Sequence, residues 1–169
     1  MLICASLAVL ALPSAAAGSS ARSATGFLVI RAATTDGGVT GRPVATIVVR
    51  GFVIGRVSQE GRVDVYHLAL PAGHGAPQAT GADLSRAAVH WRSFSGTQFS
   101  GSAFRFRAIG GTYRIIVRGS GVYLFVGGQG TATLRGSTNY PAGDGEYAFD
   151  GEAFRSLPSK PLERAIGRG

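Results

Sequence analysis

The chain contains very little sulfur. Its 169 residues include one cysteine and one methionine, and both, Cys4 and Met1, lie within the first twelve residues. The remainder therefore has no disulfide, no thiol nucleophile and no cysteine ligand for a metal. Its stability must come from burial of apolar surface, because a chain of about 150 residues buries ~70% of the surface that its unfolded form exposes. This length predicts one domain.

The amino terminus has the pattern of an export signal. Residues 1–12, MLICASLAVLAL, form an uninterrupted apolar run, which is followed by Pro13 and the small residues SAAAGSSA. This order is typical of a secretory signal peptide, and the run is too short to span a bilayer. No lysine or arginine precedes the run, and the alternative is a buried N-terminal helix. We expect a signal peptide over residues 1–17, cleaved near Ala17, and a secreted or extracytoplasmic protein.

Lysine and acidic residues are scarce as well. Nine Asp and Glu residues stand against 17 Lys and Arg, which gives a formal net charge of +8, and Lys160 is the only lysine. A basic balance favours an anionic partner. An excess of arginine over lysine, with abundant alanine and glycine, is equally what the codon usage of a GC-rich genome produces. The arrangement of the arginines must therefore decide between these two interpretations.

Amphipathic helical patterns are missing, and short strand patterns take their place. Apolar and polar residues alternate in short stretches, separated by turn sequences such as SQEG, GSG and DG. Strands recurring at intervals of about ten residues predict an all-β fold, either an antiparallel sandwich or a barrel of about ten short strands with little helix. The predicted strands are 27–33, 44–49, 52–57, 62–68, 87–94, 103–109, 112–118, 122–126, 131–134, 146–149 and 153–156.

The same patterns predict the domain boundaries. After the signal peptide we expect a flexible leader at 18–43 with a candidate first strand, one all-β domain at 44–157 and a C-terminal tail at 158–169, in which LERAI is a candidate last strand. The loop 71–83, PAGHGAPQATGAD, is expected to be disordered, or to form a small ligand mouth with Trp91. Glycine recurs about every nine residues between 101 and 136, so a β-solenoid is the alternative fold.

Arginines alternate with apolar residues in FRFRAIGGTYRIIVRG. If its two strand patterns are neighbours in one sheet, Arg105 and Arg107 share a face with Arg114 and Arg118. This arginine stripe would extend to Arg135, and guanidinium groups would hold anionic groups by charge and bidentate hydrogen bonds. Among the aromatic residues Trp91 is the candidate binding residue. The predicted binding residues are Arg105, Arg107, Arg114, Arg118, Arg135 and Trp91.

No motif for catalysis, metal or cofactor binding stands out. The histidines at 67, 74 and 90 include no His-x-His pair, so we predict no metal site. The acidic cluster in GDGEYAFDGEAF has the pattern of strand, turn and strand, which separates the carboxylates that a calcium loop or a glycosidase would need. A G-x-S-x-G elbow and a phosphate loop are both missing. We therefore predict no catalytic residue and no cofactor.

Most of the chain after residue 43 resembles a known group of proteins. The segments VVRGFVIGRVSQEGRVDVYHL, FSGSAFRFRAIGGTYRIIVRGSGVYLFVGGQGTATLRG and DGEYAFDGEAFRSLP are similar to uncharacterised small exported all-β proteins of high-GC Gram-positive bacteria. The likeness runs from about Val44 to about Pro158 and is strongest in the part with GSG and G-x-G turns. It implies an all-β fold and export, and it implies no activity.

Three functions follow as hypotheses. The first is an exported non-enzymatic β-domain of the cell envelope that binds an anionic cell-wall polymer or membrane surface through an arginine-bearing sheet face. A small secreted hydrolase or metal-dependent barrel enzyme would instead need two of Asp64, His67, His90, Asp144 and Glu146 to meet in a cleft. A self-assembling surface protein would form homo-oligomers through its strand edges. Intracellular nucleic acid is not an expected partner of an exported chain.

Overall fold

The computed structural model describes residues 25–69, 75–137 and 144–167. Its elements confirm the all-β prediction, since the described residues form strands and a single 3-10 turn, η1 (Gly38–Thr40). The signal peptide expected at 1–17 lies outside the described residues. The strands are β1 (Gly26–Ala33), β2 (Ala45–Ala69), β3 (Gln78–Thr80), β4 (Ser85–Trp91), β5 (Phe94–Gly119), β6 (Val122–Leu134), β7 (Glu146–Phe149), β8 (Arg155–Ser156) and β9 (Leu162–Ile166).

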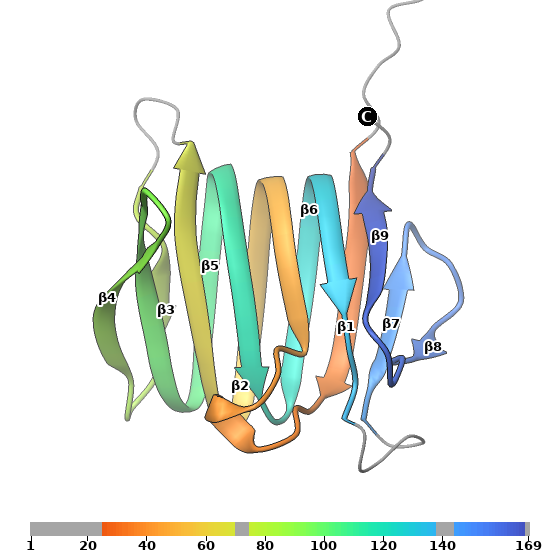
Figure 1. The fold of residues 1–169 in the computed structure, drawn as a ribbon, viewed down its shortest axis with the longest axis horizontal. Coiled ribbons are helices and arrows are strands. Elements are labelled where there is room, and N and C mark those ends of the chain that lie inside the picture. The colour runs from red at the N-terminus through yellow and green to blue at the C-terminus, as the bar shows by residue number, and fades with distance from the viewer. Residues whose placement is uncertain (1–24, 70–74, 138–143, 168–169) are drawn as a thin grey trace, which may run out of the picture.

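The sheet is folded into two layers, because its three longest strands each pass from one layer to the other (Figure 1). Layer 1 contains β3, residues 104–109 of β5, 52–57 of β2 and 122–128 of β6, then β1, β7 and β8, in that order. Layer 2 contains β4, residues 94–102 of β5, 60–69 of β2, 112–119 of β5, 45–51 of β2 and 130–134 of β6, then β9. All of these pairings are antiparallel, and the sheet is a sandwich that does not close into a barrel.

Glycines occupy the corners where a strand changes layer. Strands β2, β5 and β6 bend at the upper and lower edges of the sandwich in Figure 1. At the corner that we call the upper edge, Gly51 of β2 lies opposite Gly111 of β5 and Gly128 of β6. At the lower edge, Gly61 of β2 lies opposite both Gly101 and Gly119 of β5. A strand can turn from one sheet into another only through a bend or bulge, and here the backbones meet too closely for a side chain. A Cβ on Gly119 would lie 2.5 Å from the carbonyl oxygen of Glu60.

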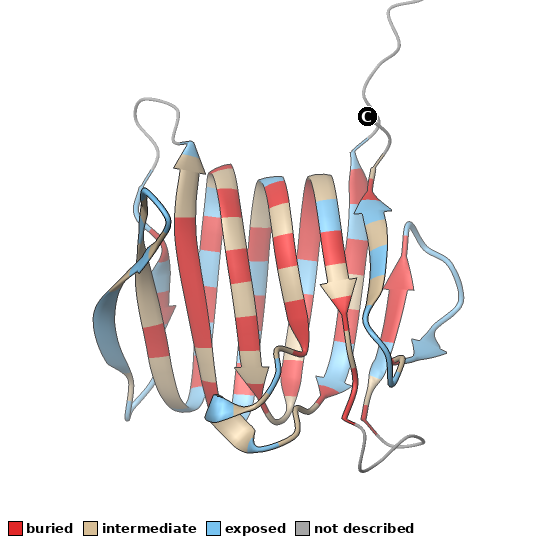
Figure 2. Cartoon of the chain, viewed as in Figure 1, coloured by how far each residue is buried: buried red, intermediate tan, exposed pale blue. Residues whose placement is uncertain are grey.

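The core lies between the layers and takes alternate residues from every strand. Figure 2 shows this alternation as bands of buried and exposed residues along β2, β5 and β6. The largest fully buried side chains are Tyr113, Phe99, Phe104 and Phe149, and most of the remaining core residues are valine, isoleucine, leucine and alanine. β-branched residues suit a pleated surface. Aliphatic and aromatic side chains therefore form the described core, and no sulfur-containing side chain is among them.

An arginine closes each open side of the sandwich. On the β3 and β4 side, Nη2 of Arg86 donates a hydrogen bond to the carbonyl oxygen of Ala79 at 2.7 Å. On the β7 and β9 side, Arg164 forms two hydrogen bonds with the carboxylate of Glu152 and lies 4.6 Å from the centre of the Phe149 ring. These contacts join the two layers at the edges, where no strand crosses between them.

The structure merges several of the predicted strands and extends the domain. The patterns at 44–49, 52–57 and 62–68 are parts of β2, those at 103–109 and 112–118 belong to β5, and those at 122–126 and 131–134 belong to β6. The leader contributes β1 and the tail contributes β9, so the sheet reaches beyond the expected limits of 44 and 157. The glycine spacing of about nine residues, taken as a solenoid signal, is the distance between corners of an antiparallel sandwich.

Candidate anion-binding face

The predicted arginine stripe is divided between two opposite faces of the molecule. Arg105 and Arg107 lie on the outer face of layer 1, whereas Arg114 and Arg118 lie on the outer face of layer 2. The prediction of a single face is therefore corrected. Gly110 and Gly111 form a corner of β5 and not a hairpin turn, so the segments on either side of them pair with different parts of β2 in different layers.

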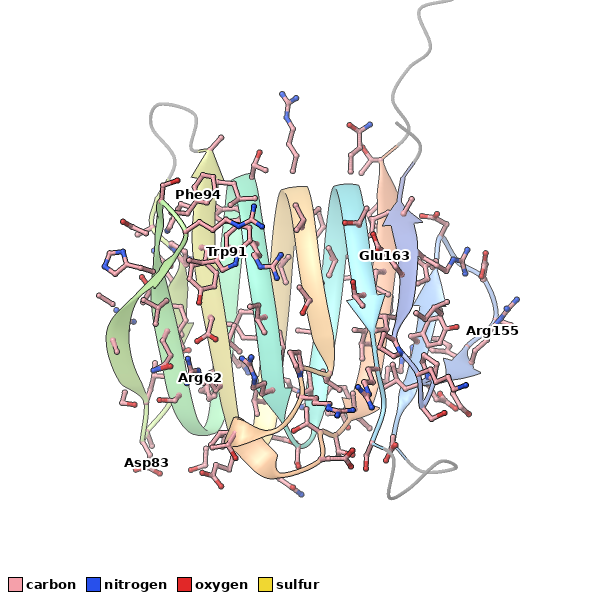
Figure 3. All side chains as sticks on the ribbon, viewed as in Figure 1. Arg62, Asp83, Trp91, Phe94, Arg155 and Glu163 are labelled. Atoms are coloured by element: carbon pink, nitrogen blue, oxygen red, sulfur yellow. The ribbon has the colours of Figure 1, made fainter. Side chains whose placement is uncertain are left out.

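Arg135 and Trp91 do not extend a basic stripe either. Arg135 follows β6, is half-buried, and donates its backbone N–H to the carbonyl oxygen of Val44 at 3.0 Å. Trp91 and Phe94 lie beside one another on layer 2, well above Arg62 in the view of Figure 3. The Trp91 ring stacks on Phe94 with centroids 5.8 Å apart, and the Arg114 guanidinium lies 4.4 Å from its centre. These contacts hold the β4–β5 hairpin against layer 2.

Part of the positive charge on the outer face of layer 2 is compensated within the protein. Asp64 is 2% exposed and accepts hydrogen bonds from Arg62 at 2.9 Å and from Arg118 at 3.1 Å. Burial raises the pKa of neighbouring Tyr66, and the charge of Asp64 raises it further. One carboxylate offsets one of these two positive charges, and both guanidinium groups already donate hydrogen bonds to Asp64. The face that carries Trp91 is therefore a poor candidate for binding a polyanion.

The outer face of layer 1 carries a row of three arginines from three strands, which we call the arginine row: Arg31, Arg56 and Arg105. Arg56 of β2 lies directly opposite Arg105 of β5 and, on its other side, opposite Tyr123 of β6. The Arg56 guanidinium lies 4.0 Å from the centre of the Tyr123 ring, and that of Arg31 lies 3.9 Å from the Phe154 ring.

Within the described part of the chain, none of the three residues of the arginine row forms an ion pair. Glu146, opposite Arg31 on β7, is the acidic residue at the margin of the row. Like charges directly opposite one another on adjacent strands are destabilising. Repulsion between Arg56 and Arg105 therefore destabilises the free protein, and a bound anion would relieve this repulsion.

An apolar row lies farther up the same face, and we define it as Phe27, Phe52 and Ile109. Phe27 and Phe52 both lie opposite Gly127 of β6, and Phe52 lies opposite Ile109 of β5. The two rings cover the backbone at Gly127, where a Cβ would lie 2.5 Å from the Phe52 ring. Phe27 and Ile109 remain 41% and 48% exposed, which is unusual for large apolar side chains on one sheet face.

A mixed row lies between the arginine row and the apolar row. Its members are Val29, Phe125, Ile54 and Arg107, which lie opposite one another in that order across β1, β6, β2 and β5. Phe125 is 41% exposed and stacks on Phe27 with parallel rings 5.7 Å apart. Arg107 donates two hydrogen bonds to Oε1 of Gln78, at 3.0 and 2.6 Å. The face thus changes from basic to apolar along the strand direction.

Two shallow grooves run between these side chains. The larger, of about 370 Å³, is lined by Arg31, Arg56 and Arg105 together with Tyr123, Phe125 and Ile54. The smaller, of about 290 Å³, is lined by Arg105 and Arg107 with Ile54 and residues of β3. Both grooves are open to solvent and share Ile54 and Arg105. An arginine row over an open, mostly apolar groove suits an extended ligand with anionic groups.

The histidines and the aspartate that an enzyme would need lie in different environments. His67 points into the core against Tyr113, and burial lowers its pKa, whereas His90 is exposed on β4. Asp144 is 4% exposed near the start of β7, and burial raises its pKa. His74 lies outside the described residues. Across the described ranges, no three His, Cys, Asp or Glu side chains are grouped as a metal would require.

Part of the loop expected at 71–83 forms a strand. Residues 71–74 fall outside the described residues, but 78–80 form β3, which pairs with Arg105–Arg107 of β5 at the edge of layer 1. Trp91 lies on the outer face of layer 2, so the two do not meet in a ligand mouth. Residues 78–80 are extended because their backbone pairs with the exposed edge of β5.

Within the part of the chain that the structure describes, no helix has the length and apolar character to cross a membrane. No protein-family model, curated protein or solved structure matches the chain. The two outer faces of the sandwich are therefore the features from which a function can be inferred.

Arg105 and Arg107 were predicted from the sequence as binding residues, whereas the other residues of this face were not. A repeated sequence pattern indicates this face. In that pattern two apolar residues and an arginine point outward and alternate with residues that point into the core. It occurs as Phe27, Val29 and Arg31 in β1 and as Phe52, Ile54 and Arg56 in β2. Strand β5 runs in the opposite direction and carries Arg105, Arg107 and Ile109, so that it has a second arginine in place of the middle apolar residue. Comparison of these three strands would have predicted the face.

Proposed function

We propose that the protein is an exported, non-enzymatic β-domain of the cell envelope that binds an anionic surface or polymer through the outer face of layer 1. The single observation that carries the proposal is the arginine row, in which Arg56 and Arg105 lie directly opposite each other with no ion pair among the described residues. Export is supported by the apolar run at residues 1–12, and the net charge of +8 agrees with an anionic partner.

The chemistry of arginine supports this role. A guanidinium group is always charged and donates paired hydrogen bonds that match phosphate, sulfate and carboxylate. Tyr123 lies beneath Arg56 at 4.0 Å and leaves the edge of the guanidinium group open to a ligand. The proposed binding residues are Arg31, Arg56, Arg105 and Arg107, of which the last two were predicted from the sequence.

The test is a salt-dependent binding measurement on the purified protein. The ligand is immobilised inorganic polyphosphate, and the variant is Arg56→Gln with Arg105→Gln. The matched control is Arg42→Gln with Lys160→Gln, which removes the same charge from two exposed residues outside the layer 1 face. We expect the wild-type protein and the control to elute at higher salt than the Arg56 and Arg105 variant, because each neutralised phosphate releases condensed counterions.

Equal elution of the two double variants would contradict the proposal. Such a result would mean that binding follows the net charge alone and that no face is specialised. Circular dichroism of each variant checks that the fold is retained. Because Arg56 and Arg105 are exposed like-charged neighbours, we expect their removal to leave stability unchanged or slightly raised.

A further inference from the structure

We infer that the layer 1 face binds an amphipathic partner, and that this partner is the surface of an anionic lipid bilayer. This inference rests on the proposed function and deepens it, because it concerns the apolar row that a hydrophilic polyanion would leave unused. Phe27, Phe125, Ile54 and Ile109 are each between 41% and 48% exposed on this face. Large exposed apolar patches on a soluble domain mark sites of contact with proteins or membranes.

The order of the rows matches the order of groups at a lipid surface. Along the strands the face passes from the arginine row, through the mixed row, to the apolar row, and successive rows are two residues apart. At a rise of about 3.3 Å per residue, the arginine row lies ~13 Å from the apolar row. An anionic lipid presents its phosphate above its acyl chain, and bound peripheral segments bury their apolar side ~5–10 Å into that boundary.

The docked domain therefore turns the outer face of layer 1 toward the bilayer and is tilted so that the edge with the apolar row lies deepest, while layer 2 faces away from the lipid. The rings of Phe27 and Phe52 and the side chain of Ile109 enter the boundary between headgroups and acyl chains. Arg56 and Arg105 then lie at the level of the phosphates, where one bidentate contact each would neutralise their mutual repulsion. Arg107 belongs to the mixed row, which lies between the arginine row and the apolar row. Its hydrogen bonds with Gln78 hold it toward the β3 edge of the layer.

A second copy of the chain does not suit this face. The rows contributed by β1, β6, β2 and β5 contain four arginines and no acidic residue. Packing two such faces together would bury guanidinium groups against one another or against phenylalanine, without a counter-charge. Burial of an unpaired charge is strongly unfavourable. Charge complementarity thus favours an anionic partner over self-association, and the apolar row favours a lipid over a hydrophilic polymer.

The experiment compares vesicles with a soluble polyanion. Co-sedimentation is measured with vesicles of phosphatidylcholine alone and of phosphatidylcholine with phosphatidylglycerol, and binding to soluble polyphosphate is measured in parallel. The apolar variant is Phe27→Thr with Ile109→Thr, which changes two exposed members of the apolar row that line neither groove, and threonine keeps the preference for strands. Its matched control on the outer face of layer 2 is Val48→Thr with Ile116→Thr, both half-buried residues.

We expect the wild-type protein to bind the vesicles that contain phosphatidylglycerol. The apolar variant should bind them about tenfold more weakly, because it removes apolar surface from the boundary region, and its affinity for polyphosphate should be unchanged. The layer 2 control should behave as the wild type does in both assays. The Arg56→Gln and Arg105→Gln variant should lose both vesicle and polyphosphate binding.

Trp91 reports independently on the orientation. It is the only tryptophan of the chain and lies on the outer face of layer 2, against Tyr66 and Phe94. Docking through layer 1 leaves it away from the bilayer, so we expect its fluorescence maximum to stay unshifted when vesicles are added. A blue shift would overturn the inference, because it would mean that the opposite face meets the lipid.

The outcomes separate the two proposals. If the apolar variant binds vesicles as tightly as the wild type, the lipid inference is wrong, and the proposed function stands provided that the arginine variant still loses polyphosphate binding. If the wild-type protein binds polyphosphate but no vesicles, the lipid inference fails in the same way. If the arginine variant and its charge-matched control are indistinguishable with both ligands, the proposed function fails, and the lipid inference fails with it.

Discussion

Glycine-to-alanine substitutions at the corners should lower the free energy of unfolding, and a comparison between positions separates the steric clash of the added Cβ from the strain of its backbone conformation. Gly119, at the lower corner, has a φ of +125°, and a Cβ there would lie 2.5 Å from both the carbonyl oxygen of Glu60 and the Cα of Gly61. Ordinary contact begins at 3.4 Å, so β2 and β5 would have to part by about 1 Å. The backbone of Gly119 is also tied to Thr35 by two hydrogen bonds, of 3.0 and 3.3 Å.

The magnitude follows from these two contributions. A side chain at an unfavourable φ costs ~1–3 kcal/mol, and separating the strands at the corner loses hydrogen bonds that contribute about 1 kcal/mol each. We expect Gly119→Ala to lower the free energy of unfolding by about 3–5 kcal/mol, against a total of ~5–15 kcal/mol for a domain of this kind. In a thermal scan the midpoint should fall by roughly 10 °C or more.

Two other glycines serve as controls. Gly151 has a φ of +78° but no atom within 4 Å of its Cβ position, so Gly151→Ala should cost only the conformational part, about 1–2 kcal/mol. Gly75 also has open space and no unusual φ, so Gly75→Ala should be neutral or slightly stabilising. Urea denaturation of the four proteins measures the series. If Gly119→Ala is no less stable than Gly151→Ala, the two layers can separate at the corner and our explanation is refuted.

Three further substitutions test the charged and buried groups. Asp64→Asn should lower the free energy of unfolding by about 1–3 kcal/mol, since it weakens two charged hydrogen bonds around a buried group; an unchanged urea midpoint would contradict this. Because burial raises the pKa of Asp144, the stability that depends on its neutral form is present below pH 3.8 and lost as the pH rises through the folded value. Asp144→Asn should therefore be more stable than wild type at pH 7 but not at pH 3, and equal stability at pH 7 would count against the raised value. Burial lowers the pKa of His67, so the stability that depends on neutral His67 is present above pH 6.5 and lost as the pH falls; in a pH series, His67→Leu should lack this loss.

The local elements were predictable because their causes are local. Alternation of apolar and polar residues identified the segments of β2, β5 and β6, and β7 at 146–149 was predicted with its observed bounds. Residues 95–102 were missed, since the polar and glycine-rich sequence SGTQFSGS has little strand preference of its own. They are extended because β4 and the second half of β2 pair with them on either side. Such pairing partners are remote in the sequence.

The binding face was only partly predictable for a related reason. A Gly-Gly pair has the same local signature in a hairpin turn and in a corner, so Arg105 and Arg114 were expected on one face. What decides between the two is whether β2 continues alongside the bend, which is a property of the whole sheet. The same ambiguity hid Arg31 and Arg56, because they become neighbours only when β1 and β2 pair on either side of β6.

The passage of β2 through both layers also constrains how the protein reaches its native state. Strand β2 pairs with β5 and β6, and those partners extend to Leu134. Very few contacts can therefore form between residues close in sequence, and chains dominated by such distant pairings fold in milliseconds to seconds, far more slowly than helical bundles. During synthesis the apolar face of β2 cannot be fully covered by its partner strands until the chain has grown past residue 134. In that interval a long, unpaired strand is exposed to other chains, and protection from aggregation becomes a requirement of biogenesis.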